Sequence, residues 1–308
     1  MIYLAPIQGF TDFVYRKAYS EVFTGVDTFF IPYISLKNNQ ILKKFEKEIL
    51  FENNPQKNVV PQVLVKDGPE MLDLSNILKN FGYNEINLNL GCPYPMVTNR
   101  GKGSGLLPHP NKIKSILNGF FEKSDQKLSL KVRSGLIQPN EIELLVPIFN
   151  EFPLSEIIFH PRIATQLYRG EVLLSAFKKV SELSKHRLVF NGDIFNLSDF
   201  KNMQGLFPNI NNWMLGRGIL MDPFLPSEIN GIHFSEEEKR AKKMDFHQMI
   251  FDTYSDKMDN QGNTLNKMKQ FWSYFSFGFP NQHKVFKKIK KAGSVEKYLN
   301  VVQTIFRD

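Results

Sequence analysis

The sequence predicts an α/β protein in which a (β/α)8 TIM-type barrel over residues 1–230 is followed by a small helical bundle over residues 235–308. Two observations favour the barrel. Eight short apolar runs alternate with amphipathic segments through about 220 residues, as in this fold. The runs are mostly continuous rather than alternating, as in strands covered on both faces. A doubly wound sheet is the alternative, but no Gly-x-Gly-x-x-Gly follows the first run.

Each predicted strand is a run of aliphatic and β-branched residues bounded by glycine, proline or polar residues. The runs cover residues 2–6, 27–31, 59–65, 85–90, 128–132, 156–160, 188–191 and 213–216. Helices are predicted between them over residues 12–23, 68–80, 111–122, 139–151, 171–184 and 197–203. In the third of these, Ile113, Ile116, Leu117 and Phe120 recur at three- and four-residue spacing and predict a buried face. Residues 35–54 give no clear signal.

The last quarter of the chain carries helical signals and no strand signal. Prolines and a glycine predict a linker over residues 222–234. Ser235 and Glu238 then form the pattern of a capping box, which predicts the start of a helix. The predicted helices cover residues 236–258, 264–277, 281–291 and 294–306, with a turn over 276–280.

Positive charge is concentrated in this helical part. The chain carries 39 Lys and Arg against 31 Asp and Glu, a net charge of +8, and residues 235–308 hold 14 of the former and 9 of the latter. Such a bias suits a polyanionic partner such as nucleic acid, and a solvated lysine-rich surface is an equal alternative. An apolar fraction of 42% with 28 Phe excludes a mainly disordered chain.

Several classes of protein and site are excluded or unsupported. Cys92 is the only cysteine, so the chain forms no internal disulfide and no cysteine-based zinc site. There is no His-Glu-x-x-His pattern, and we predict no metal. The first residues do not resemble a signal peptide, and no apolar run is long enough to span a membrane. We expect a cytoplasmic protein without membrane association, with a monomer as the default oligomeric state.

Candidate site residues lie where the predicted strands end, because the ligands of such barrels bind at the carboxyl ends of the strands. These rim residues are Pro6, Ile7, Gln8, Gln62, Asn89, Lys131, Arg133, His160, Asn191, Gly192, Asp193, Gly216 and Arg217. The glycine turns at 192 and 216–218 follow the seventh and eighth strands, where barrels often bind a phosphate. One such turn alone is more often only a tight turn, whereas two at these strands favour phosphate binding, with Arg217 as a charged donor.

Cys92 lies between Gly91 and Pro93 at the end of the fourth strand. A lone cysteine is usually an inert, buried small side chain. Its place on the rim favours a role as proton donor or nucleophile instead. The following loop, Arg100 to Gly105, is rich in glycine without matching a Walker A motif, and we expect it to move over a ligand.

These rim segments, in this order, resemble the tRNA-dihydrouridine synthase family over roughly residues 2–226. The segments that carry the resemblance are Leu4–Asp12, Asn89–Pro93, Lys131–Gly135, His160–Arg162 with Gln166, Tyr168 and Gly170, Asn191–Ile194 and Gly216–Gly218. The helical tail matches the family's C-terminal domain in size and place. Chain length and the segment 267–272 lean toward the bacterial subgroup that acts at position 16 of tRNA.

The resemblance implies an FMN-dependent oxidoreductase that reduces the C5–C6 double bond of a uridine in tRNA, with NADPH or NADH as reductant. It implies that Cys92 is the proton donor. Residues implied around FMN are Pro6, Ile7, Gln8, Gln62, Lys131, His160, Asn191, Gly192, Asp193, Gly216 and Arg217. Asn89, Arg133 and Tyr168 would face the uridine or nearby RNA, and tail lysines including Lys267 and Lys269 would contact phosphates.

Two other functions fit part of the sequence. A flavin-barrel reductase of a free pyrimidine or enone explains the rim and leaves the basic tail without a role. A non-catalytic RNA-binding protein explains the tail and leaves Cys92, Lys131 and His160 on one rim unexplained.

Overall fold

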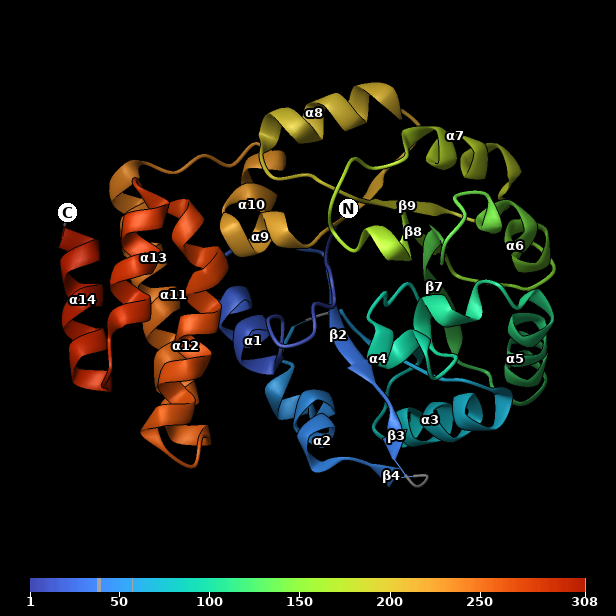
Figure 1. Ribbon diagram of the computed structural model, residues 1–308, viewed down its shortest axis with the longest axis horizontal. Coiled ribbons are helices and arrows are strands. Elements are labelled where there is room, and N and C mark those ends of the chain that lie inside the picture. The colour runs from blue at the N-terminus through green and yellow to red at the C-terminus, as the bar shows by residue number, and fades with distance from the viewer. Residues whose placement is uncertain (38–39, 57, 308) are drawn as a thin grey trace.

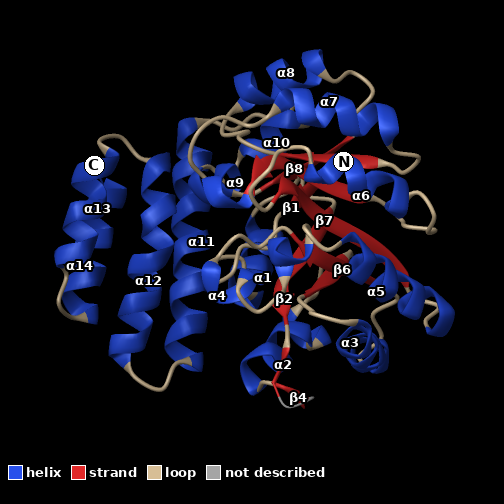
Figure 2. Ribbon diagram, turned by 45° about the vertical axis from the view of Figure 1, so that its right-hand side comes forward, coloured by secondary structure: helices blue, strands red, loops and turns tan. Residues whose placement is uncertain are grey.

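The computed structural model describes residues 1–37, 40–56 and 58–307 and shows a closed parallel barrel with a layer of helices at one side (Figures 1 and 2). Among these residues eight strands close the barrel in the order β1-β10-β9-β8-β7-β6-β5-β2, which confirms the predicted fold class. They are β1 (Ile2–Leu4), β2 (Thr28–Ile34), β5 (Val59–Val63), β6 (Glu85–Leu90), β7 (Lys127–Gly135), β8 (Ile157–Ile163), β9 (Leu188–Asn191) and β10 (Asn212–Leu215). Closure is made by β1, in which Tyr3 pairs with Met214 on one side and Thr28 on the other.

The helices that cover the barrel lie where the sequence predicts them. They are α1 (Phe13–Val22), α3 (Gly68–Asn80), α5 (Pro110–Lys123), α6 (Glu141–Phe149), α7 (Leu174–Leu183) and α8 (Leu197–Leu206). Side-chain caps explain several starts: the carboxylate of Asp12 accepts from the Tyr15 amide, and that of Asp67 accepts from the Glu70 amide. In α5 the predicted face of Ile113, Ile116, Leu117 and Phe120 is fully buried.

Smaller elements fill the segments that the sequence leaves open. The described residues of the region 35–54 form the antiparallel strands β3 (Leu36–Lys37) and β4 (Gln40–Ile41), then α2 (Lys43–Ile49) and the 3-10 turn η1 (Phe51–Asn53). The predicted linker over 222–234 is wrong in part, because it contains α10 (Leu225–Ile229). Pro226 lies in the first turn of that helix, which tolerates proline, and Leu225 is buried.

Four long helices follow, at the left of Figure 1: α11 (Glu236–Lys257), α12 (Gln261–Phe275), α13 (Gln282–Lys291) and α14 (Val295–Arg307). The predicted capping box at Ser235 is present, with both hydrogen bonds to Glu238. The 3-10 turn η4 (Ser276–Gly278) replaces the predicted turn. At the core of this helical layer the Tyr298 hydroxyl accepts from the Trp272 indole at 2.9 Å.

Helix α11 packs against α1 and joins the helical layer to the barrel (Figure 1). The ring of Phe246 contacts those of Tyr15, Tyr19 and Phe23, with centroids 5.1 to 6.2 Å apart. The contact is therefore an apolar continuation of the barrel core. Nowhere in residues 1–37, 40–56 and 58–307 does a helix have the length and apolar character needed to cross a membrane.

Candidate active site

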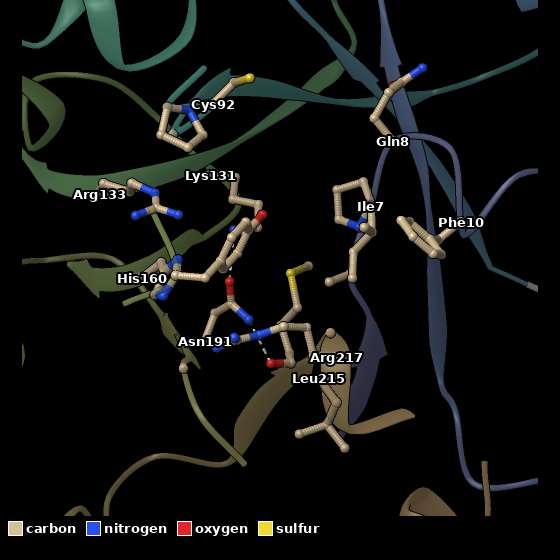
Figure 3. A pocket seen from close by; sticks show the side chains of 18 of the residues that line it. Ile7, Gln8, Phe10, Cys92, Lys131, Arg133, His160, Asn191, Leu215 and Arg217 are labelled. Atoms are coloured by element: carbon tan, nitrogen blue, oxygen red, sulfur yellow. Dashed lines mark hydrogen bonds between the residues drawn. The ribbon is translucent and has the colours of Figure 1, made fainter. Parts of the chain in front are cut away.

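A pocket of about 1090 Å³, counting its open mouth, lies at the carboxyl ends of the barrel strands (Figure 3). All the rim residues proposed from the sequence line it, together with Cys92 and Tyr168. These are Pro6, Ile7, Gln8, Gln62, Asn89, Cys92, Lys131, Arg133, His160, Tyr168, Asn191, Gly192, Asp193, Gly216 and Arg217. Residues from eight separate segments of the chain are thus brought to one cavity by the parallel barrel.

The pocket carries more positive than negative charge. Arg162 and Arg217 both bind the Asp193 carboxylate, with nitrogen–oxygen distances of 2.8 and 2.6 Å to its Oδ1. Burial opposes ionisation of Asp193, yet its bonds to the two guanidiniums hold its pKa below the usual value. Within the described part of the chain Lys131 and Arg133 bind no carboxylate: Lys131 donates to Asn191, and Arg133 donates to the Ile163 and Leu167 carbonyls. Burial and these cations hold the pKa of His160 well below its usual value, so its ring is neutral.

Lys131 reaches the middle of the pocket from β7, where its Nζ donates to Asn191 Oδ1 at 2.7 Å (Figure 3). Asn191 in turn donates to the Met214 carbonyl at 2.8 Å, which fixes the direction of its amide. Burial, and then the charge of Arg133, lower the pKa of Lys131 to about 7. A negatively charged ligand beside this ammonium would raise that pKa again, so the pocket is suited to an anion.

A chain of buried amides crosses the barrel interior and ends at Cys92. Asn87 donates to Ser129 Oγ at 2.9 Å and accepts from Gln62 Nε2 at 2.7 Å. Gln62 Oε1 accepts from Asn89 at 2.6 Å, and Asn89 Oδ1 accepts from the Cys92 amide at 2.8 Å. Asn89 therefore sets the turn that carries Cys92, and each member fixes the amide orientation of the next.

The Cys92 side chain lies at the pocket wall, 7% exposed, and is held by the segment that follows it. The Ser104 amide donates to the Cys92 carbonyl at 3.1 Å. Gly103, with φ +57°, packs so closely that a Cβ there would come within 2.9 Å of Cys92 Cβ. The glycines expected to make this loop mobile therefore include one that is needed for close packing on Cys92. Burial raises the pKa of the thiol, against the opposing effects of the Tyr94 amide and the Arg133 guanidinium.

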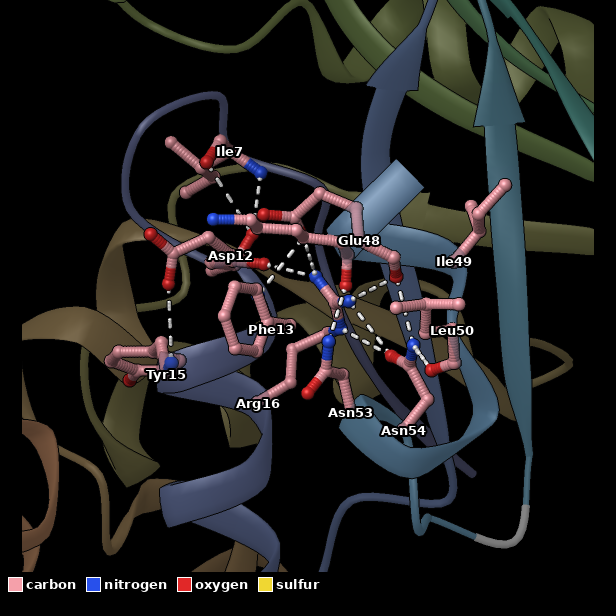
Figure 4. Close-up of polar contacts among 12 residues, drawn as sticks. Ile7, Asp12, Phe13, Tyr15, Arg16, Glu48, Ile49, Leu50, Asn53 and Asn54 are labelled. Carbon is pink, nitrogen blue, oxygen red and sulfur yellow. Dashed lines mark hydrogen bonds and ion pairs between the residues drawn. The ribbon is translucent and has the colours of Figure 1, made fainter. Parts of the chain in front are cut away.

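The loop that follows β1 and runs from Pro6 to Asp12, here called the first rim loop, packs on a buried polar cluster behind the pocket (Figure 4). Arg16 is fully buried and donates to the Thr11 carbonyl at 2.7 Å, to Glu48 Oε2 at 3.0 Å and to Asn54 Oδ1 at 2.8 Å. Three segments of the chain are thus joined through one guanidinium, which fixes the loop that begins at Pro6.

Tyr168 and several residues that the sequence analysis did not propose also line the pocket. The Arg217 and Arg133 guanidiniums lie over the Tyr168 ring at 4.9 and 5.4 Å from its centroid. The lining residues that the sequence analysis did not propose for the site, and that lie outside the segments carrying the resemblance, are Tyr33, Tyr94, Phe195, Met214, Leu215 and Tyr274. Tyr94 could have been found by its closeness to Cys92, whereas Tyr274 comes from the helical layer and no local pattern indicates it.

The two predicted RNA-contacting lysines of α12 lie outside this pocket and differ from each other. Lys267 Nζ binds Asp12 Oδ2 at 2.9 Å and donates to the Gly9 carbonyl at 2.6 Å, with 18% of its side chain exposed. It therefore joins the helical layer to the first rim loop. Lys269 is partly exposed. RNA contact by both stays a prediction.

Within the described part of the chain, no three His, Cys, Asp or Glu side chains gather into a group that could hold a metal ion.

Barrel enzymes carry their active sites at the carboxyl ends of the strands, so the fold and the position of this pocket are those of a barrel enzyme. The chain belongs to the dihydrouridine synthase family, whose model, described as Dihydrouridine synthase (Dus), matches residues 3–307. The resemblance drawn from the rim motifs is thereby confirmed, and the match extends through the helical layer.

Individual relatives are distant. A protein of Pasteurella multocida named tRNA-dihydrouridine synthase B is 27% identical over 226 residues, which are 73% of this chain and 67% of that protein. One of Helicobacter pylori, named probable tRNA-dihydrouridine synthase, is 27% identical over 237 residues, 73% of this chain and 68% of its own length. A rice tRNA-dihydrouridine(47) synthase-like protein matches 47% of this chain at 29% identity, and only 22% of its own length.

Solved structures show the same fold. A 2-naphthoyl-CoA reductase superposes with a TM-score of 0.56 at 9% identity, covering 75% of this chain and 50% of the other. Morphinone reductase superposes with a TM-score of 0.53 at 8% identity, and the match covers 77% of this chain and 88% of the other. At such identities the likeness supports the barrel architecture and not a shared reaction.

Breaking the ion pair behind the Cys92 loop should loosen that loop. Lys102 Nζ lies 2.5 Å from Glu70 Oε1, with the two side chains 13% and 11% exposed. Lys102→Met leaves Glu70 buried without its partner, so we expect a stability loss of about 3 kcal/mol. We also expect alkylation of Cys92, the only thiol, to be faster by roughly tenfold.

The controls are Lys66→Met, which breaks an exposed pair of 3.8 Å, and the double variant Lys102→Met/Glu70→Gln, which removes both charges. The first should be nearly neutral, and the second should regain part of the loss. Unchanged alkylation in Lys102→Met would show that the ion pair does not hold the loop.

Substitution of Lys267 should affect the stability of the protein, whereas substitution of Lys269 should affect its binding of tRNA. Lys267→Met should lower the free energy of unfolding by about 1–3 kcal/mol, because Asp12 and the Gly9 carbonyl lose a charged donor. Lys269→Met should leave stability within about 0.5 kcal/mol and reduce the salt dependence of tRNA binding by about one ion. Urea unfolding and binding at several salt concentrations test this, and the reverse pattern would refute the assignment.

Proposed function

We propose that this protein is a flavin-dependent tRNA-dihydrouridine synthase, which reduces the C5–C6 double bond of a uridine in tRNA. The family match over residues 3–307 supports the reaction class. The observation that carries the proposal in this chain is that its only cysteine lines the same cavity as Lys131, Arg133 and the Asp193 ion pairs. A thiol and an anion site in one pocket are what a flavin-dependent proton and hydride transfer needs.

The pocket fits FMN by the chemistry of its donors. FMN carries a phosphate, and the cavity holds more cationic side chains than carboxylates, with one lysine whose pKa is lowered to about 7. The Gln62 side chain accepts from Asn89 through its oxygen and donates to Asn87 through its nitrogen. Because an amide NH2 group has two N–H bonds, one of them is left for a ligand. The residues proposed to hold FMN are Pro6, Ile7, Gln8, Gln62, Lys131, His160, Asn191, Gly192, Asp193, Gly216 and Arg217.

The chain's own residues handle the proton and the base. Bound reduced flavin supplies a hydride, which no side chain can provide. Cys92 holds the proton destined for uridine C5, and its raised pKa keeps it a thiol until the transfer. The Lys131 ammonium offsets negative charge in the pocket. Asn89 fixes the Cys92 turn, and Arg133 and Tyr168 form the wall facing the base.

The basic helical layer supports RNA as the source of the uridine. In α13 four lysines, Lys287, Lys288, Lys290 and Lys291, share a helix whose apolar side is anchored by buried Ile289. A uridine in folded RNA must leave its stack to enter the pocket, at a cost of a few kcal/mol that phosphate contacts can offset. The reductant proposed is NADPH or NADH. A free pyrimidine as substrate would leave these lysines without a function.

The Cys92 assignment is tested by Cys92→Ala, with Cys92→Ser as the size-matched control. Purified wild type should be yellow with FMN, and both variants should retain the flavin. Reduction of tRNA should fall by about 10²–10⁴-fold, the usual contribution of a general acid. Visible absorption measures the flavin, and mass spectrometry measures dihydrouridine. Loss of flavin in the alanine variant would identify a structural cysteine, and a colourless wild type that binds no FMN would refute the flavin enzyme.

Lys131 should make FMN binding depend on pH. With the pKa of the free protein lowered to about 7, the ammonium must be regained at higher pH when an anion binds beside it. The affinity for FMN should therefore fall as pH rises from about 7 to 9. In Lys131→Met that dependence should be lost, with weaker binding at pH 7. Fluorescence titration measures it, and equal slopes in the two proteins would contradict the role of Lys131.

A further inference from the structure

Helix α12 reaches from the helical layer into the candidate active site. Tyr274, in the last turn of α12, lines the pocket together with residues of the barrel rim. Its ring meets that of Phe10 edge to face, with centroids 4.9 Å apart and planes at 79°. Since Phe10 also lines the pocket, the two rings form one wall made jointly by the barrel and by a helix that begins more than 240 residues later in the chain.

This wall is held in place by polar contacts on its far side. Lys267 and Tyr254 both bind Asp12, the tyrosine hydroxyl at 2.8 Å from Oδ2, and Lys267 also donates to the Gly9 carbonyl. Gly9 has φ +85°, and a Cβ there would lie 3.0 Å from the Gln270 amide nitrogen. The first rim loop is therefore packed closely against α12, and the helix that carries Tyr274 cannot move away from this loop without breaking these bonds.

Tyr274 lies at the mouth rather than the floor of the cavity. Its side chain is partly exposed, and Tyr94, which also lines the pocket, is 46% exposed. Cys92, which is 7% exposed, is more deeply buried and lies where we propose that the base reacts. A polynucleotide with one base at the floor must pass the mouth with its next nucleotide.

We propose that Tyr274, backed by Phe10, is a substrate-contact residue that stacks on the nucleobase adjacent to the reduced uridine. The inference rests on the proposed function, because it takes RNA as the substrate. Aromatic rings stack on any base at a gain of about 1–3 kcal/mol, so this contact selects a nucleotide within a polynucleotide over a free nucleoside without reading its sequence. The helical layer then has a second task beside phosphate binding, which is to complete the substrate site.

The test compares wild type with Tyr274→Ala, Tyr274→Phe and the control Phe277→Ala. Phe277 is a neighbouring aromatic residue, 49% exposed in η4, that does not line the pocket. We expect kcat/KM for tRNA to fall about tenfold or more in Tyr274→Ala, and to change less than about threefold in Tyr274→Phe, because the ring does the stacking. Phe277→Ala should match wild type. FMN affinity and the rate of flavin reduction by NADPH should stay within about twofold in all four proteins.

A tRNA that carries an abasic nucleotide beside the target uridine tests whether the neighbouring base is what stacks on Tyr274. Wild type should lose about tenfold in kcat/KM on this substrate, whereas Tyr274→Ala should lose little more, because the stacking partner is already gone. Equal losses in both proteins would overturn the proposal, as would an FMN affinity that falls with Tyr274→Ala. A wild type that binds flavin and reduces no tRNA would instead refute the proposed function, before any variant is compared.

Discussion

The site depends on closure of a parallel barrel through its first strand. Because β1 pairs with β10 on one side and β2 on the other, all eight strands end at one rim. Each strand then delivers one or two polar residues to the same cavity, although their positions in the chain span more than 200 residues. The consequence is an excess of positive charge in a partly closed space, which Asp193 relieves only in part. An anionic ligand offsets the remainder.

Two networks convert this arrangement into defined geometry. The amide chain from Ser129 through Asn87, Gln62 and Asn89 sets the backbone of the Cys92 turn. The contacts of Asp12 with the helical layer do the same for the first rim loop. The geometry of the pocket therefore depends also on residues that do not line it, such as Ser129, Asn87 and Asp12. Stability and function are linked at both places, because the same bonds hold the fold and position the reacting groups.

Much of the barrel and of its rim could be predicted from the sequence, because continuous apolar runs and the polar residues that end them are local signals. The strands, the rim residues and the capping box at Ser235 follow from such signals. Helix α10 could not be predicted, because tertiary burial of Leu225 outweighs a proline-rich composition. The elements β3, β4, α2 and η1 also escaped prediction, because each is too short to show a clear hydrophobic period. Tyr274 in the pocket and the bond of Lys267 to Asp12 also escaped prediction, since only the packing of α12 on the rim creates them.

The main proposal is that this protein reduces one uridine of tRNA in the rim pocket, with Cys92 as the proton donor. Its most direct test maps dihydrouridine, position by position, in tRNA from cells that lack this protein and from the same cells carrying the wild-type chain or Cys92→Ala. Dihydrouridine should disappear from a defined position, return with the wild-type chain and stay absent with the variant. An unchanged map in cells lacking the protein, or full restoration by Cys92→Ala, would contradict it.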